Sequence, residues 1–239
     1  MKIVQVLLTF VIILLVLLTR LFSPPIEVHK FGQGNGPTIC LIGSVHGNEE
    51  AGTHALYDMI RNKSNNLNAF KGTIYIIPNP NPLGIQYHTR YAYSTNKGWY
   101  DLNRQYNNPH NEKNPVIQTI LEYVHKSDLV LEFHEGYYFH SLDPSSLGST
   151  ISPTNLVSNE TIDAMEYAIN QFIHEPHKKF QILRDDDCAI PTTLSCYCRK
   201  NKIPYVLIEI SGQNNIQPLP LRMEQVKTLA LTALDSQNT

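Results

Sequence analysis

The feature that most constrains the fold is an uninterrupted apolar run, Thr38–Ser44, with the sequence TICLIGS. It follows Gly32–Pro37, a glycine-rich stretch that is typical of a turn. A short apolar run bounded by turn signals is expected for a strand that is buried on both faces of a sheet. Such a strand needs cover on either side, so the run favours an α/β protein.

Further along the chain, strand-like runs alternate with segments of helical periodicity. This alternation predicts a mixed, mostly parallel twisted sheet flanked by helices on both faces. Ligands in such folds collect where the strands end and the loops begin. The predicted strands are Ile26–Phe31, Thr38–Ser44, Gly72–Ile77, Leu129–Phe133 and Ile203–Ile210. The predicted helices are Glu49–Arg61, Val116–His125 and Leu221–Leu234, and the polar, asparagine-rich stretch 83–115 is expected to be a long loop over a site.

The N-terminal segment differs from the rest of the chain. Ile3–Leu18 contains only two polar residues, Gln5 and Thr9. The run is shorter than a membrane-spanning helix, which needs about 20 residues, and at the upper limit of a signal-peptide core, which has about 7–15. No small-residue cleavage site follows it. We expect residues 1–25 to form an N-terminal hydrophobic helix and linker, an uncleaved signal anchor that contacts the membrane through residues 3–22. A cleaved signal peptide and a buried core helix are the alternatives.

Charge and cysteine usage limit the partners and the compartment. The 19 Lys+Arg nearly balance the 21 Asp+Glu, so no basic excess exists to bind nucleic acid. Cys188, Cys196 and Cys198 cluster near an expected helix, but they lack the C-x-x-C spacing of zinc clusters. We expect packing residues or, if the domain is exported, a disulfide from Cys188 to one of the other two. Residues 26–239 are expected to form one domain, membrane-anchored or exported, on the non-cytoplasmic side.

A histidine and a glutamate follow the first buried strand. His46 and Glu49 are three residues apart in the sequence HGNE, and Gly47 between them permits a tight turn. Imidazole and carboxylate are normal zinc ligands, and a catalytic zinc site uses three protein ligands and an open position for water. The pair alone is also compatible with a helix-capping turn whose polar groups are exposed.

Two later strands also end near ionisable residues. His134 directly follows Leu129–Phe133 and could supply a third ligand, with Glu135 and His140 as alternatives. A histidine at a strand end can equally be an ordinary surface residue. Glu209 interrupts the last predicted strand, and a carboxylate buried alone is unfavourable, so it must be paired, solvated or functional.

The order of these motifs resembles a known family. HxxE after a buried strand, an asparagine–proline stretch, an arginine, DLNR at Asp101–Arg104, the pair Phe133-His134 and a late glutamate follow one another. This order resembles the zinc carboxypeptidase superfamily and, within it, the succinylglutamate desuccinylase and aspartoacylase branch. The resemblance runs from about Thr38 to Gly212.

The resemblance implies a role for each motif. It implies one Zn²⁺ ion with three ligands, His46, Glu49 and His134. It also implies two catalytic residues. Glu209 would be the general base and acid, and Arg90 would polarise the scissile carbonyl. It implies two residues that bind the substrate's carboxylate, Asn103 and Arg104. Asp101 would orient His46, as carboxylates beside ligating imidazoles do.

These roles predict a function for the domain. We expect a zinc-dependent hydrolase that cleaves an amide bond adjacent to a carboxylate, as an N-acyl amino acid deacylase does. A peptide or cell-wall metallocarboxypeptidase and a non-catalytic binding module on the same fold are the alternatives. The expected partner is a small molecule or peptide that bears a carboxylate. Tyr197 and Tyr205 are candidates, by position only, for the family's substrate-side tyrosine. The chain ends soon after Glu209, so we expect it to lack the C-terminal domain of typical aspartoacylases.

Overall fold

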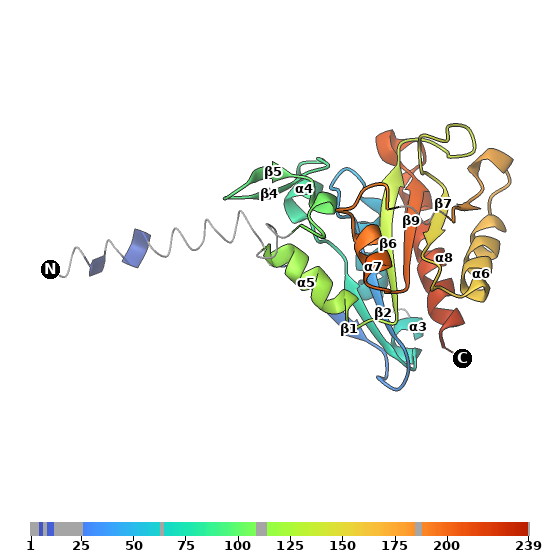
Figure 1. Ribbon diagram of the computed structural model, residues 1–239, viewed down its shortest axis with the longest axis horizontal. Helices are drawn as coiled ribbons and strands as arrows, with labels where there is room; N and C mark the ends of the chain where they lie inside the picture. Colours follow the sequence, from blue (N-terminus) through green and yellow to red (C-terminus); the bar gives the residue numbers. More distant parts are fainter. Residues whose placement is uncertain are drawn as a thin grey trace.

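A seven-stranded sheet forms the centre of the protein. The computed structural model describes residues 5–6, 9–11, 26–62, 65–108, 114–184 and 188–238. The strand order is β1-β3-β2-β6-β9-β7-β8 (Figure 1). The strands are β1 (His29–Phe31), β2 (Thr38–Ile42), β3 (Thr73–Ile77), β6 (Leu129–Gly136), β7 (Thr150–Pro153), β8 (Gln181–Ile182) and β9 (Tyr205–Ser211). The four central strands β3, β2, β6 and β9 are parallel, whereas β1 and β7 pair antiparallel with their central neighbours.

The helices cover both faces of this sheet. One hydrophobic core lies between the sheet and α2 (Ala51–Arg61), α3 (Asn65–Ala69), α6 (Asn159–Asn170) and α8 (Leu219–Ser236). The second core lies under α5 (Pro115–Val124) and α7 (Leu194–Lys200) on the other face. Side chains alternate between these cores along each strand, as the pleat requires. In β6, Leu131 and Phe133 enter the first core and Val130 enters the second.

Local polar residues begin several of these helices. The Asn114 side chain accepts a hydrogen bond from Val116 N before Pro115 starts α5, and Ser158 accepts one from Thr161 N at α6. Thr193 does the same for Cys196 N at α7. Such side chains satisfy amide groups that have no partner within the helix, so these helix starts are encoded locally.

The predicted α/β architecture and its mostly parallel sheet are confirmed. The prediction for β6 was too short, because the strand continues through His134 and Glu135 to Gly136. Its pairing with β9 extends as far as Gly136 beside Ser211. Backbone pairing with a neighbour thus sustains the strand beyond the apolar run that identified it.

The expected long loop contains more regular structure than predicted. It includes α4 (Pro82–Gln86), a hairpin of β4 (Ala92–Ser94) and β5 (Gly98–Tyr100), and a 3-10 turn η1 (Leu102–Arg104). The Asn81 side chain accepts a hydrogen bond from Gly84 N and begins α4, so the asparagine–proline stretch ends in a helix. No prediction was made for β7, β8 and α6, whose short or polar segments lack a clear apolar pattern.

The predicted N-terminal hydrophobic helix lies mostly outside the described residues. Of residues 1–25, only positions 5–6 and 9–11 are described, and these are helical. In the described part of the chain, no helix has the length and apolar character needed to cross a membrane.

Candidate metal centre

A tight loop between β2 and α2 carries His46 and Glu49. The Glu49 amide donates to the His46 carbonyl at 3.1 Å, which brings both side chains to the start of α2. Gly47 is required for a reason other than the predicted turn freedom. A Cβ at this position would lie 1.8 Å from the Gly84 carbonyl carbon, so only glycine allows α4 to pack against the loop. The Asn81 side chain also donates to the Val45 carbonyl and holds α4 there.

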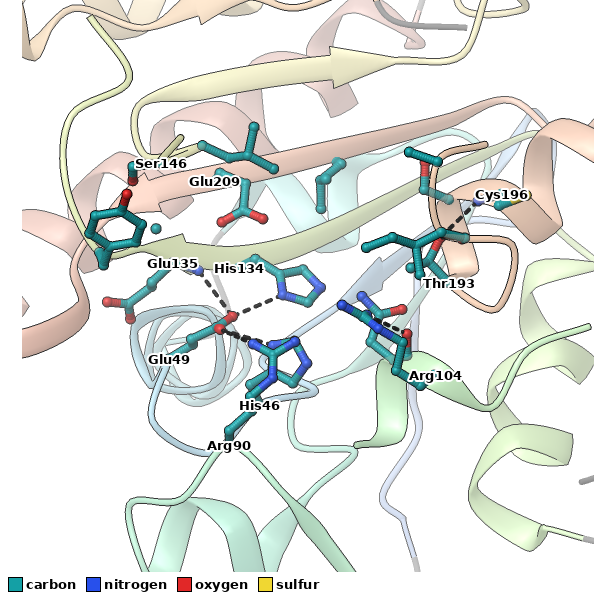
Figure 2. A pocket seen from close by; sticks show the side chains of 18 of the residues that line it. His46, Glu49, Arg90, Arg104, His134, Glu135, Ser146, Thr193, Cys196 and Glu209 are labelled. Atoms are coloured by element: carbon teal, nitrogen blue, oxygen red, sulfur yellow. Dashed lines mark hydrogen bonds and ion pairs between the residues drawn. The ribbon is translucent and has the colours of Figure 1, made fainter. Parts of the chain in front are cut away.

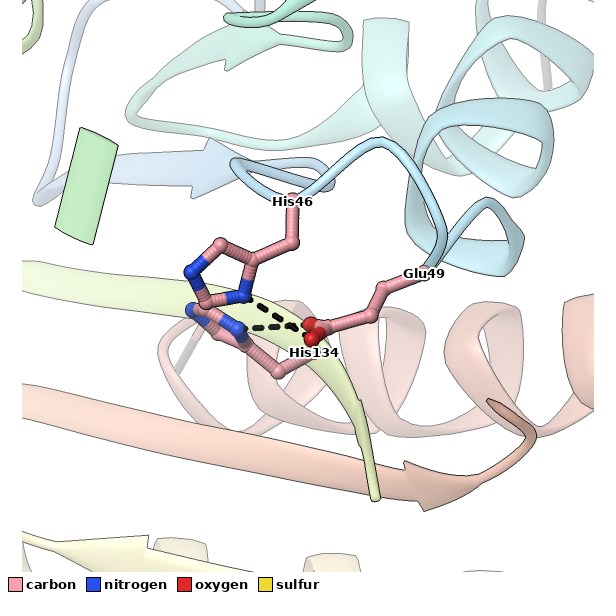
Figure 3. Close-up of side chains that lie close together, drawn as sticks. All are labelled: His46, Glu49 and His134. Atoms are coloured by element: carbon pink, nitrogen blue, oxygen red, sulfur yellow. Dashed lines mark hydrogen bonds and ion pairs between the residues drawn. The ribbon is translucent and has the colours of Figure 1, made fainter. Parts of the chain in front are cut away.

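His46, Glu49 and His134 meet at the carboxyl edge of the parallel strands (Figure 3). The Nδ1 atom of His46 lies 2.9 Å from Glu49 Oε1, and the Nδ1 atom of His134 lies 2.8 Å from Glu49 Oε2. One ligand atom from each residue lies within 4.8 Å of the others, and all three residues are buried. Two imidazoles and one carboxylate form a donor set that suits zinc, so the arrangement fits a metal ion.

Two further groups hold the Glu49 carboxylate. The Glu135 amide donates to Oε2 at 3.2 Å, and Gln213 Nε2 donates to Oε1 at 3.1 Å. Gln213 also donates to the Glu135 carbonyl, which ties the segment after β9 to the end of β6. These contacts orient the carboxylate toward both imidazoles.

The charges of the cluster match those of a cation site. Burial raises the pKa of the Glu49 carboxyl, but the charges of His46 and His134 and their hydrogen bonds outweigh it and hold that pKa well below its usual range. Burial lowers the pKa of both imidazoles, but nearby carboxylates reverse this and raise it above the ordinary value. The cluster therefore stabilises positive charge at the two imidazoles, which a bound metal ion would supply in place of their protons.

Asp101 and Arg90 lie beside His46. Asp101 Oδ1 lies 3.1 Å from His46 Nε2, and Arg90 Nε and Nη2 each lie 2.9 Å from Asp101 Oδ2. Arg90 Nη1 also approaches Glu49 Oε1 at 3.6 Å. Asp101 therefore lies where the resemblance places an orienting carboxylate, and Arg90 lies at the edge of the cluster.

Glu209 projects from β9 beside the cluster. It pairs with His134 in the parallel register of β6 and β9, so both side chains are on the same face of the sheet. Glu209 lines the pocket above Glu49 (Figure 2). Burial raises its pKa to about 7, although the nearby His134 opposes that rise. A carboxylate with such a pKa can accept and donate a proton near neutral pH.

The cluster opens into a pocket of about 350 Å³. This volume lies at the small end of the range for ligand sites. Asn103, Arg104 and Arg199 line the pocket together with Arg90, so among the described residues three guanidinium groups line it. The Asn103 side-chain oxygen accepts from Leu194 N at the start of α7, which attaches the DLNR turn to that helix.

The alternatives for the third ligand lie elsewhere. Glu135 projects to the opposite face of the sheet and forms an ion pair with Arg222. His140 Nδ1 lies 2.7 Å from the Ser146 carbonyl, away from His46 and Glu49. Tyr197 contacts His125, and the buried Tyr205 hydroxyl donates to Glu132. Neither tyrosine directs its hydroxyl to the metal cluster.

The cysteine cluster forms part of the pocket wall. Cys188 and Cys196 form a disulfide, and both line the pocket. Cys196 lies across the pocket from His46 and Glu49 (Figure 2). Cys198, two residues further along α7, is free and faces the second core with Cys40. The possible disulfide partners of Cys188 are thus reduced to one.

Several residues of the site were not found from the sequence. Glu132, Gln213, Arg199 and Tyr137 all contact the cluster or line the pocket. Glu132 interrupts an apolar strand as Glu209 does, and that signal was available but was applied only to Glu209. Gln213 and Tyr137 follow strand ends in segments without a pattern of their own.

Comparisons with known proteins agree with this geometry. Residues 35–141 match the model of the succinylglutamate desuccinylase/aspartoacylase catalytic domain. A search of curated protein sequences finds no match. Among solved structures, the chain is similar to apo Cell Shape Determinant protein Csd4 from Helicobacter pylori, with 17% identity and a TM-score of 0.73. That match covers 90% of this chain and 55% of the Csd4 chain, so the protein spans about half the length of Csd4.

Two other structures show the same fold. The mDAP-bound form of Helicobacter pylori Csd4, described as a D,L-carboxypeptidase, matches with 18% identity and a TM-score of 0.69 over 85% of this chain and 51% of that one. A candidate metallopeptidase from Shewanella denitrificans OS217 matches with 15% identity and a TM-score of 0.64 over 90% of this chain and 80% of that one. The resemblance expected from the sequence is therefore confirmed: the chain is similar to the zinc carboxypeptidase superfamily, and its residues 35–141 match the catalytic domain of the succinylglutamate desuccinylase/aspartoacylase branch.

Proposed function

We propose that this protein is a zinc-dependent hydrolase that cleaves an amide bond adjacent to a carboxylate. The observation that carries the proposal is the convergence of His46, Glu49 and His134, with Glu209 beside His134 on the neighbouring strand. These three residues would hold the ion, and Glu209 would act on the water. The matched catalytic domain supports the same reaction class.

The chain's own residues have separable tasks in this reaction. A zinc ion at the cluster would act as a Lewis acid and lower the pKa of a water molecule. Glu209 accepts a proton from the attacking water and delivers it to the leaving nitrogen, so that water and amide become a carboxylic acid and an amine, and the acid then passes its proton to the amine to give a carboxylate and an ammonium ion. Arg90 donates to the carbonyl oxygen as it becomes negative, and loss of such a donor typically lowers the rate by about 100–1000-fold.

The pocket indicates an anionic substrate. Arg104 offers two parallel donors that suit a carboxylate, and Arg199 adds a further positive charge to the same pocket. An N-acyl amino acid presents an amide nitrogen and a carboxylate on the same carbon atom. The C-terminal residue of a peptide presents the same pair of groups. A carboxypeptidase is therefore the second candidate, and the fold shared with Csd4 favours it.

The test combines metal analysis with one substitution. We expect the purified chain to contain one zinc ion, to lose activity with a chelator and to regain it with zinc. Glu209→Gln should keep the zinc and abolish turnover, because glutamine cannot accept the proton. Glu122→Gln on the exposed surface of α5 is the matched control and should behave as wild type.

The substrate panel pairs N-acyl amino acids with short peptides, each offered with a free and an amidated carboxyl group. We expect turnover of the free acids only. A wild-type protein without zinc, or full activity in Glu209→Gln, would contradict the proposed function. Equal turnover of the amidated compounds would contradict the carboxylate requirement.

We also propose that the domain lies outside the cytoplasm, anchored or exported by residues 3–22. The apolar N-terminal run and the Cys188–Cys196 disulfide support this, because disulfides persist in oxidising compartments. The test is to quench cells with acid, block free thiols by alkylation and measure whether Cys188 and Cys196 were alkylated. We expect both cysteines to escape alkylation because they form the disulfide. Fully reduced Cys188 and Cys196 under those conditions would rule out export.

A further inference from the structure

The two imidazoles of the cluster direct the same ring nitrogen, Nδ1, toward the metal site. Both direct Nδ1 to Glu49, and both direct Nε2 to a second carboxylate. For His46 that carboxylate is Asp101, at 3.1 Å. For His134 it is Glu132, whose Oε1 lies 3.4 Å from Nε2. The resemblance implies a role for Asp101 and none for Glu132.

The environment of Glu132 is unusual for a carboxylate. Its side chain is 0% exposed in the middle of the central strand β6. Among the described residues, no arginine or lysine forms an ion pair with Glu132, and His134 is the cationic partner it has. Asp101, in contrast, is 16% exposed and has Arg90 as a counter-charge. A buried carboxylate with so little compensation destabilises the fold, and an apolar side chain would suit this position better.

Tyr205 holds the other oxygen of Glu132. Its buried hydroxyl donates to Oε2 from the adjacent strand β9. Burial and the charge of Glu132 hold the pKa of Tyr205 well above 10, so the phenol keeps its proton and remains a donor. With Oε2 occupied, Oε1 is left facing His134. Glu132 Oε1 and His134 Nε2 lie 3.4 Å apart, and neither atom has a hydrogen-bond partner among the described residues, so each is the polar group nearest to satisfying the other.

This arrangement selects one form of the imidazole. A neutral histidine carries one ring hydrogen, and the partner of one nitrogen determines which nitrogen is free to bind a metal. A carboxylate that accepts the hydrogen at Nε2 leaves the lone pair at Nδ1, which faces Glu49 and His46. It also makes the imidazole a stronger ligand.

We propose that Glu132, held in place by Tyr205, is the positioning residue for His134 and directs its Nδ1 to the metal. The proposal rests on the metal site proposed above. Tyr205, Glu132 and His134 form a buried series of contacts from the wall of the pocket to the proposed metal site. The stability lost by burying the carboxylate is offset by tighter metal binding.

The test measures zinc affinity and the stability of the metal-free protein separately. Glu132→Gln keeps the shape and removes the charge, and we expect its zinc dissociation constant to rise about 10–100-fold in a chelator competition assay. Its metal-free stability should be unchanged or higher, because a buried charge is gone. A second variant, Glu132→Leu with Tyr205→Phe, replaces both polar groups by apolar ones. It should also bind zinc more weakly while its metal-free stability is unchanged or higher.

Asp101→Asn is the matched comparison at His46, and Glu122→Gln is the surface control. Imidazole nitrogen NMR of the zinc-bound protein adds a readout, since the Nε2 hydrogen of His134 should lose its carboxylate acceptor in the Glu132 variants and its resonance should shift. Unchanged zinc affinity in both Glu132 variants, with zinc bound normally by the wild type, would overturn this inference alone. A parallel loss of affinity and metal-free stability would also overturn it, because it indicates a structural role only. A wild type that binds no zinc would overturn the metal site and this inference together.

Discussion

Each face of strand β6 carries one buried carboxylate, and the two carboxylates have different partners. Glu135, 1% exposed, faces α8 and α2, where Arg222 forms an ion pair with it and the Ala51 amide donates to it. Glu132 faces the pocket side and has a phenol and an imidazole instead. The charge of Glu135 is thus balanced by an arginine, as is usual for a buried ion pair with a structural role. Glu132 is left to interact with a group of the metal cluster, so the same strand serves stability on one face and chemistry on the other.

The largest effect is expected on the structural face. Arg222→Met leaves Glu135 without its cation, and breaking a buried pair in this way costs about 3–5 kcal/mol. We expect this loss in the free energy of unfolding at pH 8, measured by urea denaturation of the metal-free protein. Burial raises the pKa of Glu135 to about 7 even beside Arg222. Without the arginine that pKa is higher still, so at pH 5 the carboxyl is protonated and the loss is smaller.

The sign of this pH dependence follows from proton binding. Between the unfolded and folded pKa values the folded state holds a proton that the unfolded chain has released, so stability falls as the pH rises. Lys227→Met on the same helix is the control. Lys227 forms more exposed ion pairs with Asp58 and Glu224, and its loss should cost less than about 1 kcal/mol. Adding Glu135→Gln to Arg222→Met should recover most of the lost stability. Equal losses of stability in Arg222→Met and Lys227→Met would show that the buried ion pair contributes no more than the exposed ones.

A smaller effect is expected on the pocket face. Glu209 has no arginine or lysine ion pair among the described residues, and burial raises its pKa to about 7. A general base must be ionised, so kcat/KM should fall as the pH drops through this pKa. The fall approaches tenfold, or about 1.4 kcal/mol, for each pH unit below it. A bound cation favours the ionised form, so we expect the midpoint below 7.

The measurement is a pH profile of kcat/KM with bound zinc determined at each pH. Zinc occupancy separates the titration of Glu209 from loss of the ion when His46 and His134 are protonated. A rate that rises as the pH falls from 7 to 5, at constant occupancy, would show that Glu209 does not act as the base. A flat profile over the same range would place its pKa well below the value that burial sets.

Local patterns predicted a large part of the fold. The central strands were found because each is an apolar run between turn residues, and α5 because it repeats apolar residues at helical spacing. The short strands β7 and β8 and the hairpin β4–β5 were missed, because runs of two to four residues carry too little pattern and pairing with a neighbour determines them. Motif order, together with the resemblance, pointed to the residues that the structure brings together around Glu49.

The cysteines show where local reasoning stops. Cys196 and Cys198 were equal candidates as partners of Cys188, because both are near it in sequence. On α7 they lie about 200° apart around the helix axis. Cys196 therefore faces the pocket and forms the disulfide, while Cys198 packs into the core. Only the orientation of the helix on the sheet distinguishes them.

The sequence by itself determined the central strands β3, β2, β6 and β9 and the helices α2, α5 and α8, because an apolar run or a helical repeat is encoded within a few neighbouring residues. The order of its motifs, with the resemblance, also indicated the metal-ligand candidates. The tertiary structure decided what each carboxylate of β6 does. Glu132 and Glu135 are three residues apart in one strand, and their difference arises from Tyr205, His134 and Arg222, which approach from opposite faces. Electrostatic interactions act over a few ångströms in space, so the partners that set a charge's role can come from any part of the chain.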